Sequence, residues 1–152
     1  MASLWQEREK QLLALRERAK RGGGEARMNK QRAAGKLTAR ERLTLLFDPD
    51  TFVEIGELVE SRIDDFGMDE RRVPGDGVVI GYGRVNGRTV CASSEDFTVI
   101  GGTLGEYHSQ KICRIMDMAI DMKCPFVLIN DSGGARIEEG VASLSGYADI
   151  FR

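Results

Sequence analysis

Residues 126–140 read Phe126-Val127-Leu128-Ile129-Asn130-Asp131-Ser132-Gly133-Gly134-Ala135-Arg136-Ile137-Glu138-Glu139-Gly140, an apolar run that passes through two glycines into a helical pattern. Such a run is typical of a strand buried on both faces. A sharp turn from strand to helix leaves backbone N–H groups free, and these can hold a phosphate or the oxyanion of a reacting thioester. Gly133-Gly134 therefore marks a candidate site, with a tight packing turn as the structural alternative.

The segments around this turn predict an α/β fold. β-prone runs flank Asn86-Gly87, the strongest short-range hairpin signal, and 97–100 indicates a further short strand. Thr103 to Glu106 forms a capping box before a helix that ends near Lys123. The order strand, helix, strand, turn, helix predicts a βαβ unit. The last helix is expected to present one apolar stripe, made of Ile137, Val141, Leu144, Ala148 and Phe151.

Residues 1–50 predict a helical arm in three pieces, and residues 51–152 predict the α/β domain. Capping boxes begin the first and third pieces, at Ser3 to Gln6 and Thr38 to Glu41, while 22–24 is a glycine run that ends the first. A strand is expected at 51–56. The charged, glycine-containing stretch 61–76 predicts a mobile surface loop.

The arm and the domain differ in charge. Through Leu46 there are 12 Lys and Arg against 5 Asp and Glu, whereas the remainder holds 10 against 19. A basic arm suits an anionic cofactor or the acidic face of a partner. Nucleic acid is disfavoured, because no aromatic residues are interleaved with the basic ones. A solvated amphipathic helix is the simpler alternative.

Composition excludes several classes of protein. The 152 residues are 41% apolar, which is enough for one domain with a core, and no run is long enough to span a membrane. Residues 1–7 lack the apolar region of a signal peptide, so a cytoplasmic protein is expected, or one of the mitochondrial matrix in a eukaryote. Cys91, Cys113 and Cys124 are odd in number and share no C-x-x-C spacing, so neither disulfides nor a metal site is expected.

Motifs for other chemistries are missing or badly spaced. Neither a phosphate loop nor G-x-G-x-x-G is present. A nucleophilic Ser132 would need Asp131 and His108 as partners, but Ser132 lies outside a G-x-S-x-G elbow, and a lone histidine on an apolar helix face is usually a packed one. Gly101-Gly102-Thr103 resembles the Gly133-Gly134 turn, because it also places free N–H groups at the start of a helix. The two turns are therefore hypothesised to flank one cleft.

Three segments that lie apart in the sequence together resemble one protein family. Residues 35–43, 96–106 and 131–147 resemble the carboxyltransferase β-subunit of biotin-dependent acyl-CoA carboxylases, a family that includes propionyl-CoA carboxylase and methylmalonyl-CoA carboxyltransferase. The resemblance runs from Ser3 to the last residue in the order of the family's amino-terminal domain. Small departures are Glu138-Glu139 in place of the usual Gln-Glu, and Ser93-Ser94-Glu95 in place of a shorter Gln-containing run.

The resemblance implies a crotonase-like (ClpP/crotonase) fold of ββα superhelical layers and transfer of a carboxyl group between carrier-bound biotin and the α-carbon of an acyl-CoA. It assigns the oxyanion donors to the backbone of Gly133, Gly134 and Ala135, which would stabilise a thioester enolate. Substrate contacts are expected from Gly101, Gly102, Thr103 and Arg136.

The resemblance also implies partners and an incomplete site. Biotin would arrive on a separate carrier with a biotin carboxylase subunit, and the full-length subunit would form a homo-oligomer. Because the family's second oxyanion segment and second domain would lie beyond Arg152, the chain is expected to be an amino-terminal fragment without activity of its own. Two alternatives stay open: a crotonase-type acyl-CoA hydrolase or hydratase, and a non-catalytic assembly fragment.

Overall fold

The computed structural model describes residues 3–152. Short 3₁₀ turns lie at 65–67, 69–71, 100–102 and 137–139. The longer elements, in chain order, are α1 Leu4–Lys20, α2 Glu25–Ala33, α3 Ala39–Leu46, β1 Val53–Ile55, β2 Val78–Val85, β3 Arg88–Glu95, α4 Glu106–Asp121, β4 Phe126–Ile129 and α5 Gly140–Phe151.

The strands form one sheet in the order β1-β2-β3-β4. β2 pairs antiparallel with β1 and β3, whereas β4 runs parallel to β3, so β3, α4 and β4 form the predicted βαβ unit. The β2–β3 hairpin closes at Asn86-Gly87, where φ is positive at both residues (50° and 77°), as a type I′ turn requires.

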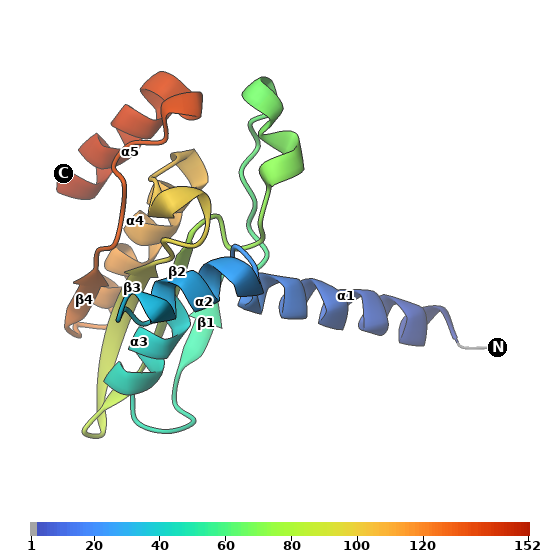
Figure 1. Cartoon of the computed structure of the whole chain (residues 1–152). Helices are drawn as coiled ribbons and strands as arrows, with labels where there is room; N and C mark the ends of the chain where they lie inside the picture. The colour runs from blue at the N-terminus through green and yellow to red at the C-terminus, as the bar shows by residue number, and fades with distance from the viewer. Residues whose placement is uncertain (1–2) are drawn as a thin grey trace.

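Helices cover both faces of the sheet, so the body has three layers (Figure 1). Successive strand residues point to opposite faces. On one face, Val79 packs with residues of α3, including Leu43. On the other, Ile80 packs with Ile112 of α4. Gly83 needs to lack a side chain, because a Cβ there would lie 2.8 Å from the ring of Phe47.

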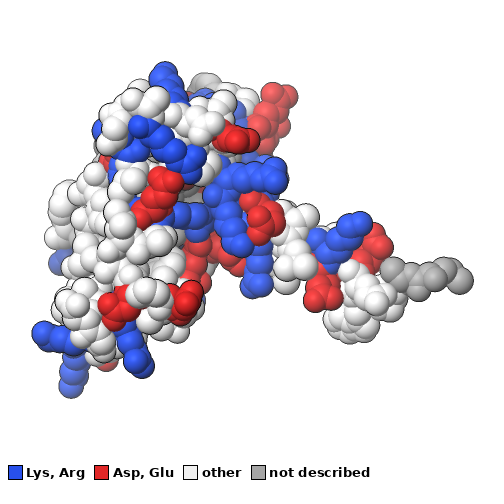
Figure 2. Space-filling model, turned by 60° about the horizontal axis from the view of Figure 1, so that its bottom comes forward, with Lys and Arg blue, Asp and Glu red and all other residues white. Residues whose placement is uncertain are grey.

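Of the three helices of the predicted arm, α1 projects from the body, whereas α2 and α3 lie against it (Figure 1). The predicted capping boxes at Ser3 and Thr38 are both present. The carboxyl-terminal end of α1 is fastened to the body, with Arg16 Nε 2.7 Å from Glu57 Oε1. Trp5 near its other end is 80% exposed, and acidic and basic side chains are mixed along the arm (Figure 2). Within residues 3–152, no helix is long and apolar enough to cross a membrane.

Residues 97–100 form turns instead of the predicted strand. The Asp96 carboxylate accepts the backbone N–H of Thr98 at 3.0 Å and its hydroxyl at 2.6 Å. Such side-chain hydrogen bonds compete with strand pairing. Ile100 has φ of +48°, and the 3₁₀ turn 100–102 follows.

The predicted capping box at Thr103 is also wrong. α4 begins at Glu106 after Gly105, and the Thr103 hydroxyl donates to the Ile100 backbone oxygen at 2.7 Å. The first amide of α4, that of Glu106, donates to Glu139 Oε2 at 2.6 Å. A carboxylate from a distant segment therefore occupies the helix start that local sequence assigned to Thr103.

The last part of the chain departs most from expectation. Residues 130–136 form neither helix nor strand, and α5 starts only at Gly140. Its predicted stripe faces outward, with Leu144 61% and Phe151 82% exposed, while Ser143 and Gly146 are the buried positions. Gly146 lies against Ser109 of α4, so close approach of the helices selects small residues there. In β4, which lies at the edge of the described sheet, Leu128 is 39% exposed, so the strand is not buried on both faces.

Candidate functional site

The two glycine turns lie side by side, as hypothesised. The Gly133 N–H donates to the Gly101 backbone oxygen at 2.9 Å, and the Leu104 N–H donates to the Gly134 oxygen at 2.9 Å. Leu104 and Ala135 form a parallel β-bridge. A short backbone ladder therefore joins residues 101–104 to residues 133–136 and fixes their relative position.

This pairing changes which backbone donors are available. The Gly133 N–H is taken by Gly101, and the Gly134 N–H donates to Ser132 Oγ at 3.1 Å. The Ala135 N–H has no acceptor among residues 3–152, since the bonds of the bridge are made by its neighbours. Of the three N–H groups predicted as oxyanion donors, those of Gly133, Gly134 and Ala135, the structure therefore leaves that of Ala135 without an acceptor among the described residues.

Gly134 is a glycine for conformational reasons. Its φ is +104°, which side-chain-bearing residues rarely adopt, yet a Cβ there would meet no atom within 4 Å. The space around the turn is open, so any substitution acts through the backbone. Gly102 is different: its Cβ would lie 2.3 Å from the Asp131 backbone oxygen.

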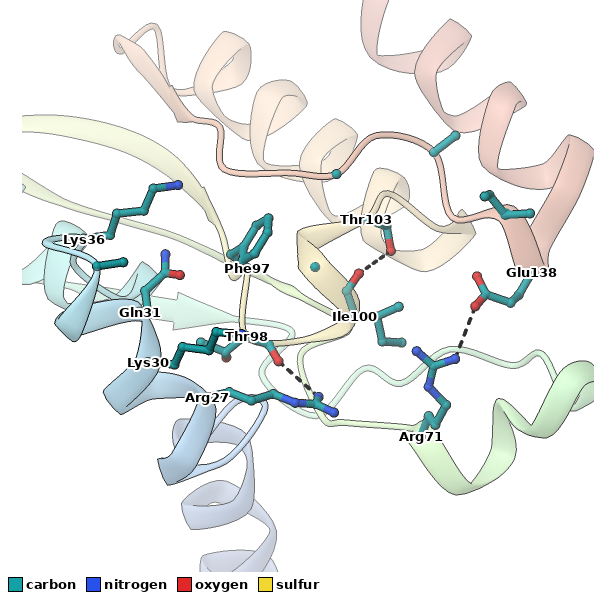
Figure 3. Close-up of a pocket in the computed structure, with 15 residues that line it drawn as sticks. Arg27, Lys30, Gln31, Lys36, Arg71, Phe97, Thr98, Ile100, Thr103 and Glu138 are labelled. Carbon is teal, nitrogen blue, oxygen red and sulfur yellow. Dashed lines mark hydrogen bonds and ion pairs between the residues drawn. The ribbon is translucent and has the colours of Figure 1, made fainter.

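A cavity of about 650 Å³ opens between the turns and the arm (Figure 3). Gly101, Thr103, Gly133 and Ala135 line one part of it. Apolar side chains contribute to the lining as well, including Phe97, Ile100 and Ile137. The charged and amide side chains that reach the cavity are Arg27, Lys30, Gln31, Lys36, Arg71 and Glu138. Gly134 instead lines a second cavity, of about 480 Å³, that also contains Tyr147.

Asp131 fastens the arm to the glycine turn. Its carboxylate accepts from Gln31 at 2.9 Å, from Lys36 at 3.0 Å, and from Arg42. Burial raises the pKa of Asp131, but these donors outweigh burial and the pKa lies below its usual value. The ammonium of Lys36 also lies 5.4 Å from the ring centroid of Phe97. Asp131 is thus an ionised structural acceptor.

Ser132 and His108 do not form a nucleophile and base. Ser132 Oγ donates to the Gly102 backbone oxygen at 2.6 Å, so its proton is already engaged. The ring of His108 is fully buried, with Nδ1 3.0 Å from the Asp76 backbone oxygen and Nε2 3.7 Å from Glu95. Both side chains have structural roles in this conformation.

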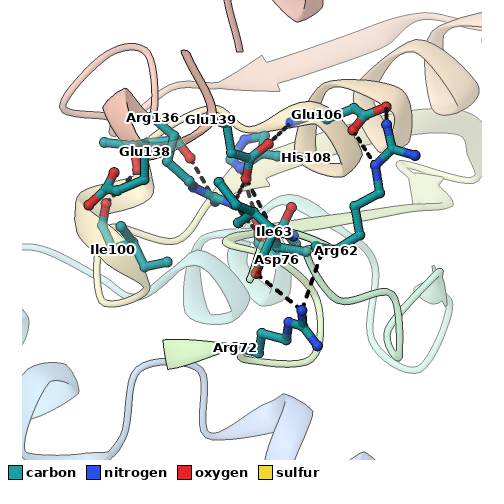
Figure 4. Close-up of polar contacts among 12 residues, drawn as sticks. Arg62, Ile63, Arg72, Asp76, Ile100, Glu106, His108, Arg136, Glu138 and Glu139 are labelled. Carbon is teal, nitrogen blue, oxygen red and sulfur yellow. Dashed lines mark hydrogen bonds and ion pairs between the residues drawn. The ribbon is translucent and has the colours of Figure 1, made fainter. Parts of the chain in front are cut away.

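Arg136 lies in a buried ion cluster (Figure 4). Its Nη1 is 2.7 Å from both Asp76 Oδ1 and Glu139 Oε1, and Nη2 donates to the Thr103 backbone oxygen at 3.0 Å. Its exposure is 0%, so this geometry does not support the predicted direct contact with substrate. Arg136 instead holds the Thr103 turn.

The carboxylates of this cluster differ in their pKa. Burial raises the pKa of Asp76 despite the nearby Arg136. Burial also raises the pKa of Glu139, but the Glu106 N–H and Arg136 outweigh it and the pKa is lowered. Sequence reasoning missed Asp76 because it lies 60 positions from Arg136, in a stretch assigned to a mobile loop. That stretch is anchored, since Met68 is 1% exposed and Asp76 2%.

Comparison with known proteins then identifies the family. A family model described as "Carboxyl transferase domain" matches residues 30–152. The chain belongs to the carboxyl transferase domain family. It is 57% identical over 134 residues to the propionyl-CoA carboxylase beta chain of Cereibacter sphaeroides (88% of this chain, 26% of that protein). It is 58% identical over 130 residues to the methylmalonyl-CoA decarboxylase subunit alpha of Propionigenium modestum (86% and 25%). The chain therefore spans about a quarter of the length of these curated relatives.

A solved relative supports the same assignment. The crystal structure of transcarboxylase 12S, a hexamer with methylmalonyl-coenzyme A and methylmalonic acid bound, superposes with a TM-score of 0.94 at 49% identity, covering 99% of this chain and 30% of that chain. A Pseudomonas malonate decarboxylase hetero-tetramer gives 0.67 at 27% identity, covering 75% and 44%. The predicted crotonase-like α/β fold with a helical amino-terminal part is confirmed.

Proposed function

We propose that the chain supplies the acyl-CoA-binding part of a carboxyltransferase that moves a carboxyl group between carboxybiotin and the α-carbon of a short acyl-CoA. The main support for this proposal is the cavity between the two glycine turns and the basic residues of the arm. Three relatives support propionyl-CoA and methylmalonyl-CoA as the substrate pair, because their names refer to one or the other.

In this proposal, the turns hold the reacting thioester. Removal of the α-carboxyl group or of an α-proton leaves an enolate, whose negative charge lies largely on the thioester oxygen. A fixed N–H donor stabilises that charge without reorganising during the reaction. We assign this role to the Ala135 N–H, with Gly133 and Gly134 shaping the turn that presents it. Gly101 and Thr103 line the same cavity and are proposed to contact the acyl-CoA, whereas Gly102 is buried.

The arm is proposed to hold the phosphates of CoA. Arg27, Lys30 and Lys36 line the cavity. Lys36 is partly neutralised by Asp131, and Arg27 donates to the Thr98 backbone oxygen at 3.3 Å. Lys30 has no ion-pair partner among the described residues, so it is the most available cation. Cationic side chains bind phosphate through charge-assisted hydrogen bonds.

Other components come from outside these residues. We propose that biotin arrives on a carrier protein with a biotin carboxylase subunit, and that the complete subunit forms a homo-oligomer, as the hexameric transcarboxylase does. The proposed location is the cytoplasm, or the mitochondrial matrix in a eukaryote, where the human relative is named as mitochondrial.

Calorimetric titration of CoA into the 152-residue chain tests this proposal. Lys30→Glu should weaken binding about tenfold, the value of one charge-assisted contact. Lys10→Glu makes the same charge change on the projecting helix and should leave affinity unchanged. Equal affinity of the wild-type chain for CoA and pantetheine would remove the phosphate contacts from the proposal.

The hydrolase or hydratase alternative requires a side-chain acid or base beside the turn. Asp131 and Glu139 are both bound to cations and have lowered pKa values, so at neutral pH they are poor proton donors and weak bases. Glu138 lines the cavity but pairs with Arg71 at 3.2 Å. In a complete subunit, Glu138→Gln should retain most turnover, and loss of turnover would favour this alternative.

The non-catalytic alternative predicts assembly without CoA affinity. It is supported by the exposed apolar residues of α1, such as Trp5 and Leu12, which offer a surface for a partner. Size-exclusion chromatography with a complete carboxyltransferase subunit separates the possibilities. Co-elution of a chain that does not bind CoA would support assembly alone.

A further inference from the structure

Two of the three cysteines lie in contact in the folded chain. Cys91 lies in β3 and Cys124 lies between α4 and β4, and their Sγ atoms are 3.6 Å apart. Both are free thiols in the structure. The sequence predicted no disulfide, because 33 positions separate the two residues and no C-x-x-C spacing marks them. The parallel pairing of β3 with β4 brings them together.

Backbone hydrogen bonds hold these two thiols in place. The Cys91 N–H donates to the Pro125 backbone oxygen at 2.9 Å, and the Cys124 N–H donates to the Ala119 backbone oxygen at 3.0 Å. Both side chains belong to the core between the sheet and α4, which also contains Ile115. A disulfide needs sulfur atoms about 2 Å apart, so the two sulfurs would have to approach by about 1.5 Å. An approach of this size is within reach of rotation about the two Cα–Cβ bonds.

The two thiols differ in their exposure. Cys91 is 0% exposed, whereas Cys124 is only partly buried. Burial and the neighbouring thiol of Cys124 raise the pKa of Cys91 to about 12, so Cys91 is a neutral thiol at physiological pH. An oxidant reacts with an accessible thiolate, so it should meet Cys124 first. Cys91 then lies beside the oxidised sulfur as its partner.

We propose that Cys91 and Cys124 form a reversible disulfide when a peroxide oxidises the chain. The Cys124 thiolate attacks one oxygen of hydrogen peroxide, and the O–O bond breaks. The hydroxide that leaves takes up the proton given up by the thiol and forms water, so a sulfenic acid results. The Cys91 sulfur then attacks the Cys124 sulfur, the S–O bond breaks, and the hydroxyl group leaves as water with the Cys91 proton. The two sulfurs lose two electrons, and the peroxide gains them.

The disulfide would join β3 to the start of β4 and close a loop that contains α4. It would lie at the end of β4 away from the glycine turns, and neither cysteine lines the cavity of the proposed acyl-CoA site. The modification therefore acts on the stability of the fold and does not depend on the proposed function. In the reducing compartments proposed above, disulfides are usually transient and respond to oxidation.

Mass spectrometry of the 152-residue chain tests the modification. The reduced chain is treated with hydrogen peroxide, denatured and alkylated. The free thiols should fall from three to one, and digestion should yield one pair of peptides linked through Cys91 and Cys124. Dithiothreitol should restore all three thiols. Oxidation that leaves Cys91 and Cys124 unlinked, or that joins Cys113 of two chains instead, would overturn the proposal.

Three variants separate the roles of the cysteines. Cys113→Ser is the matched control, since Cys113 has no thiol within hydrogen-bond distance among residues 3–152, and it should form the bond as fast as the wild type. In Cys91→Ala the partner is missing, so dimedone should trap a sulfenic acid on Cys124 that the wild type consumes. Where Cys91→Ala does not fold, Cys124→Ser takes its place, and Cys91 should then resist oxidation. Equal dimedone labelling of Cys124 in wild type and Cys91→Ala, or rapid oxidation of Cys91 in Cys124→Ser, would refute the assigned roles.

The stability of the oxidised chain is a separate readout. A disulfide that closes a loop of this length should raise Tm by about 10 °C. Cys113→Ser should show the same rise after peroxide treatment, and Cys91→Ala should show none. An unchanged or lower Tm of the oxidised wild type would mean that the bond does not fit the native fold, which contradicts the proposal.

Discussion

The buried ammonium of Lys111 should give folding a measurable pH dependence. Nζ donates to the backbone oxygens of Gly75, at 2.7 Å, and Val78, so it holds the segment that carries Asp76 against α4. Burial lowers the pKa of Lys111 from 10.5 to about 8. Between these values the unfolded chain binds one more proton than the folded chain. The free energy of unfolding therefore rises with pH across this window.

The size of the effect follows from the pKa difference. One pKa unit corresponds to about 1.4 kcal/mol, so raising the pH from 8 to 9.5 should raise the free energy of unfolding by about 2 kcal/mol relative to a variant without the amine. Lys111→Met is that variant, with a similar length and no titration. It leaves two carbonyls without a donor, which lowers its stability by about 1–3 kcal/mol at every pH and does not alter the slope.

Denaturant unfolding followed by circular dichroism between pH 7.5 and 9.5 measures the difference. Cysteines and tyrosines titrate in both proteins, so their contributions cancel in the comparison. Lys10→Met removes an exposed amine on α1 and should follow the wild-type slope. Parallel curves for wild type and Lys111→Met would refute the claim that Lys111 is buried with a lowered pKa.

Three further substitutions probe the turns and their supports. Gly134→Val should lower kcat of a complete subunit about 100-fold by moving the Ala135 N–H, because no L-residue suits φ of +104°; an unchanged kcat would remove this turn from the mechanism. Gly105→Ala should lower the free energy of unfolding by about 1–3 kcal/mol in denaturant unfolding, since its Cβ would lie 2.4 Å from Glu139 Oε1; Gln110→Ala, at an exposed position of α4, should have little effect. Asp131→Asn should remove stability that the wild type holds at neutral pH and loses as pH falls below 3.8 toward the lowered pKa; wild-type and variant curves that stay parallel from pH 7 to pH 3 would contradict this.

Short sequence patterns correctly predicted those elements that are stabilised by contacts between residues close together in the sequence. The capping boxes at Ser3 and Thr38 and the Asn86-Gly87 turn are confirmed, because each depends on residues within four positions. The similar pattern at Thr103 failed, since Glu139 supplies the cap from 33 positions away. The stripe of α5 failed for a related reason: the small Gly146, not the leucine and phenylalanine, meets α4.

The sequence predicted that the two glycine turns lie together, but not the hydrogen bonds that join them. Gly101 and Gly133 do line one cavity, and each belongs to a turn that the sequence marks by two successive glycines. No local signal indicates that Gly101 accepts the Gly133 N–H, or that Arg136 pairs with Asp76 at 60 positions' separation. Both contacts join segments that are far apart in the sequence.

The most direct test of the acyl-CoA site is to follow the backbone amides of the ¹⁵N-labelled chain during titration with propionyl-CoA. The account predicts that the Ala135 amide shifts in proportion to occupancy, and that Gly101, across the same cavity, shifts with it. Binding with no change at Ala135, or shifts confined to α5, would contradict the assignment of this turn as the thioester site.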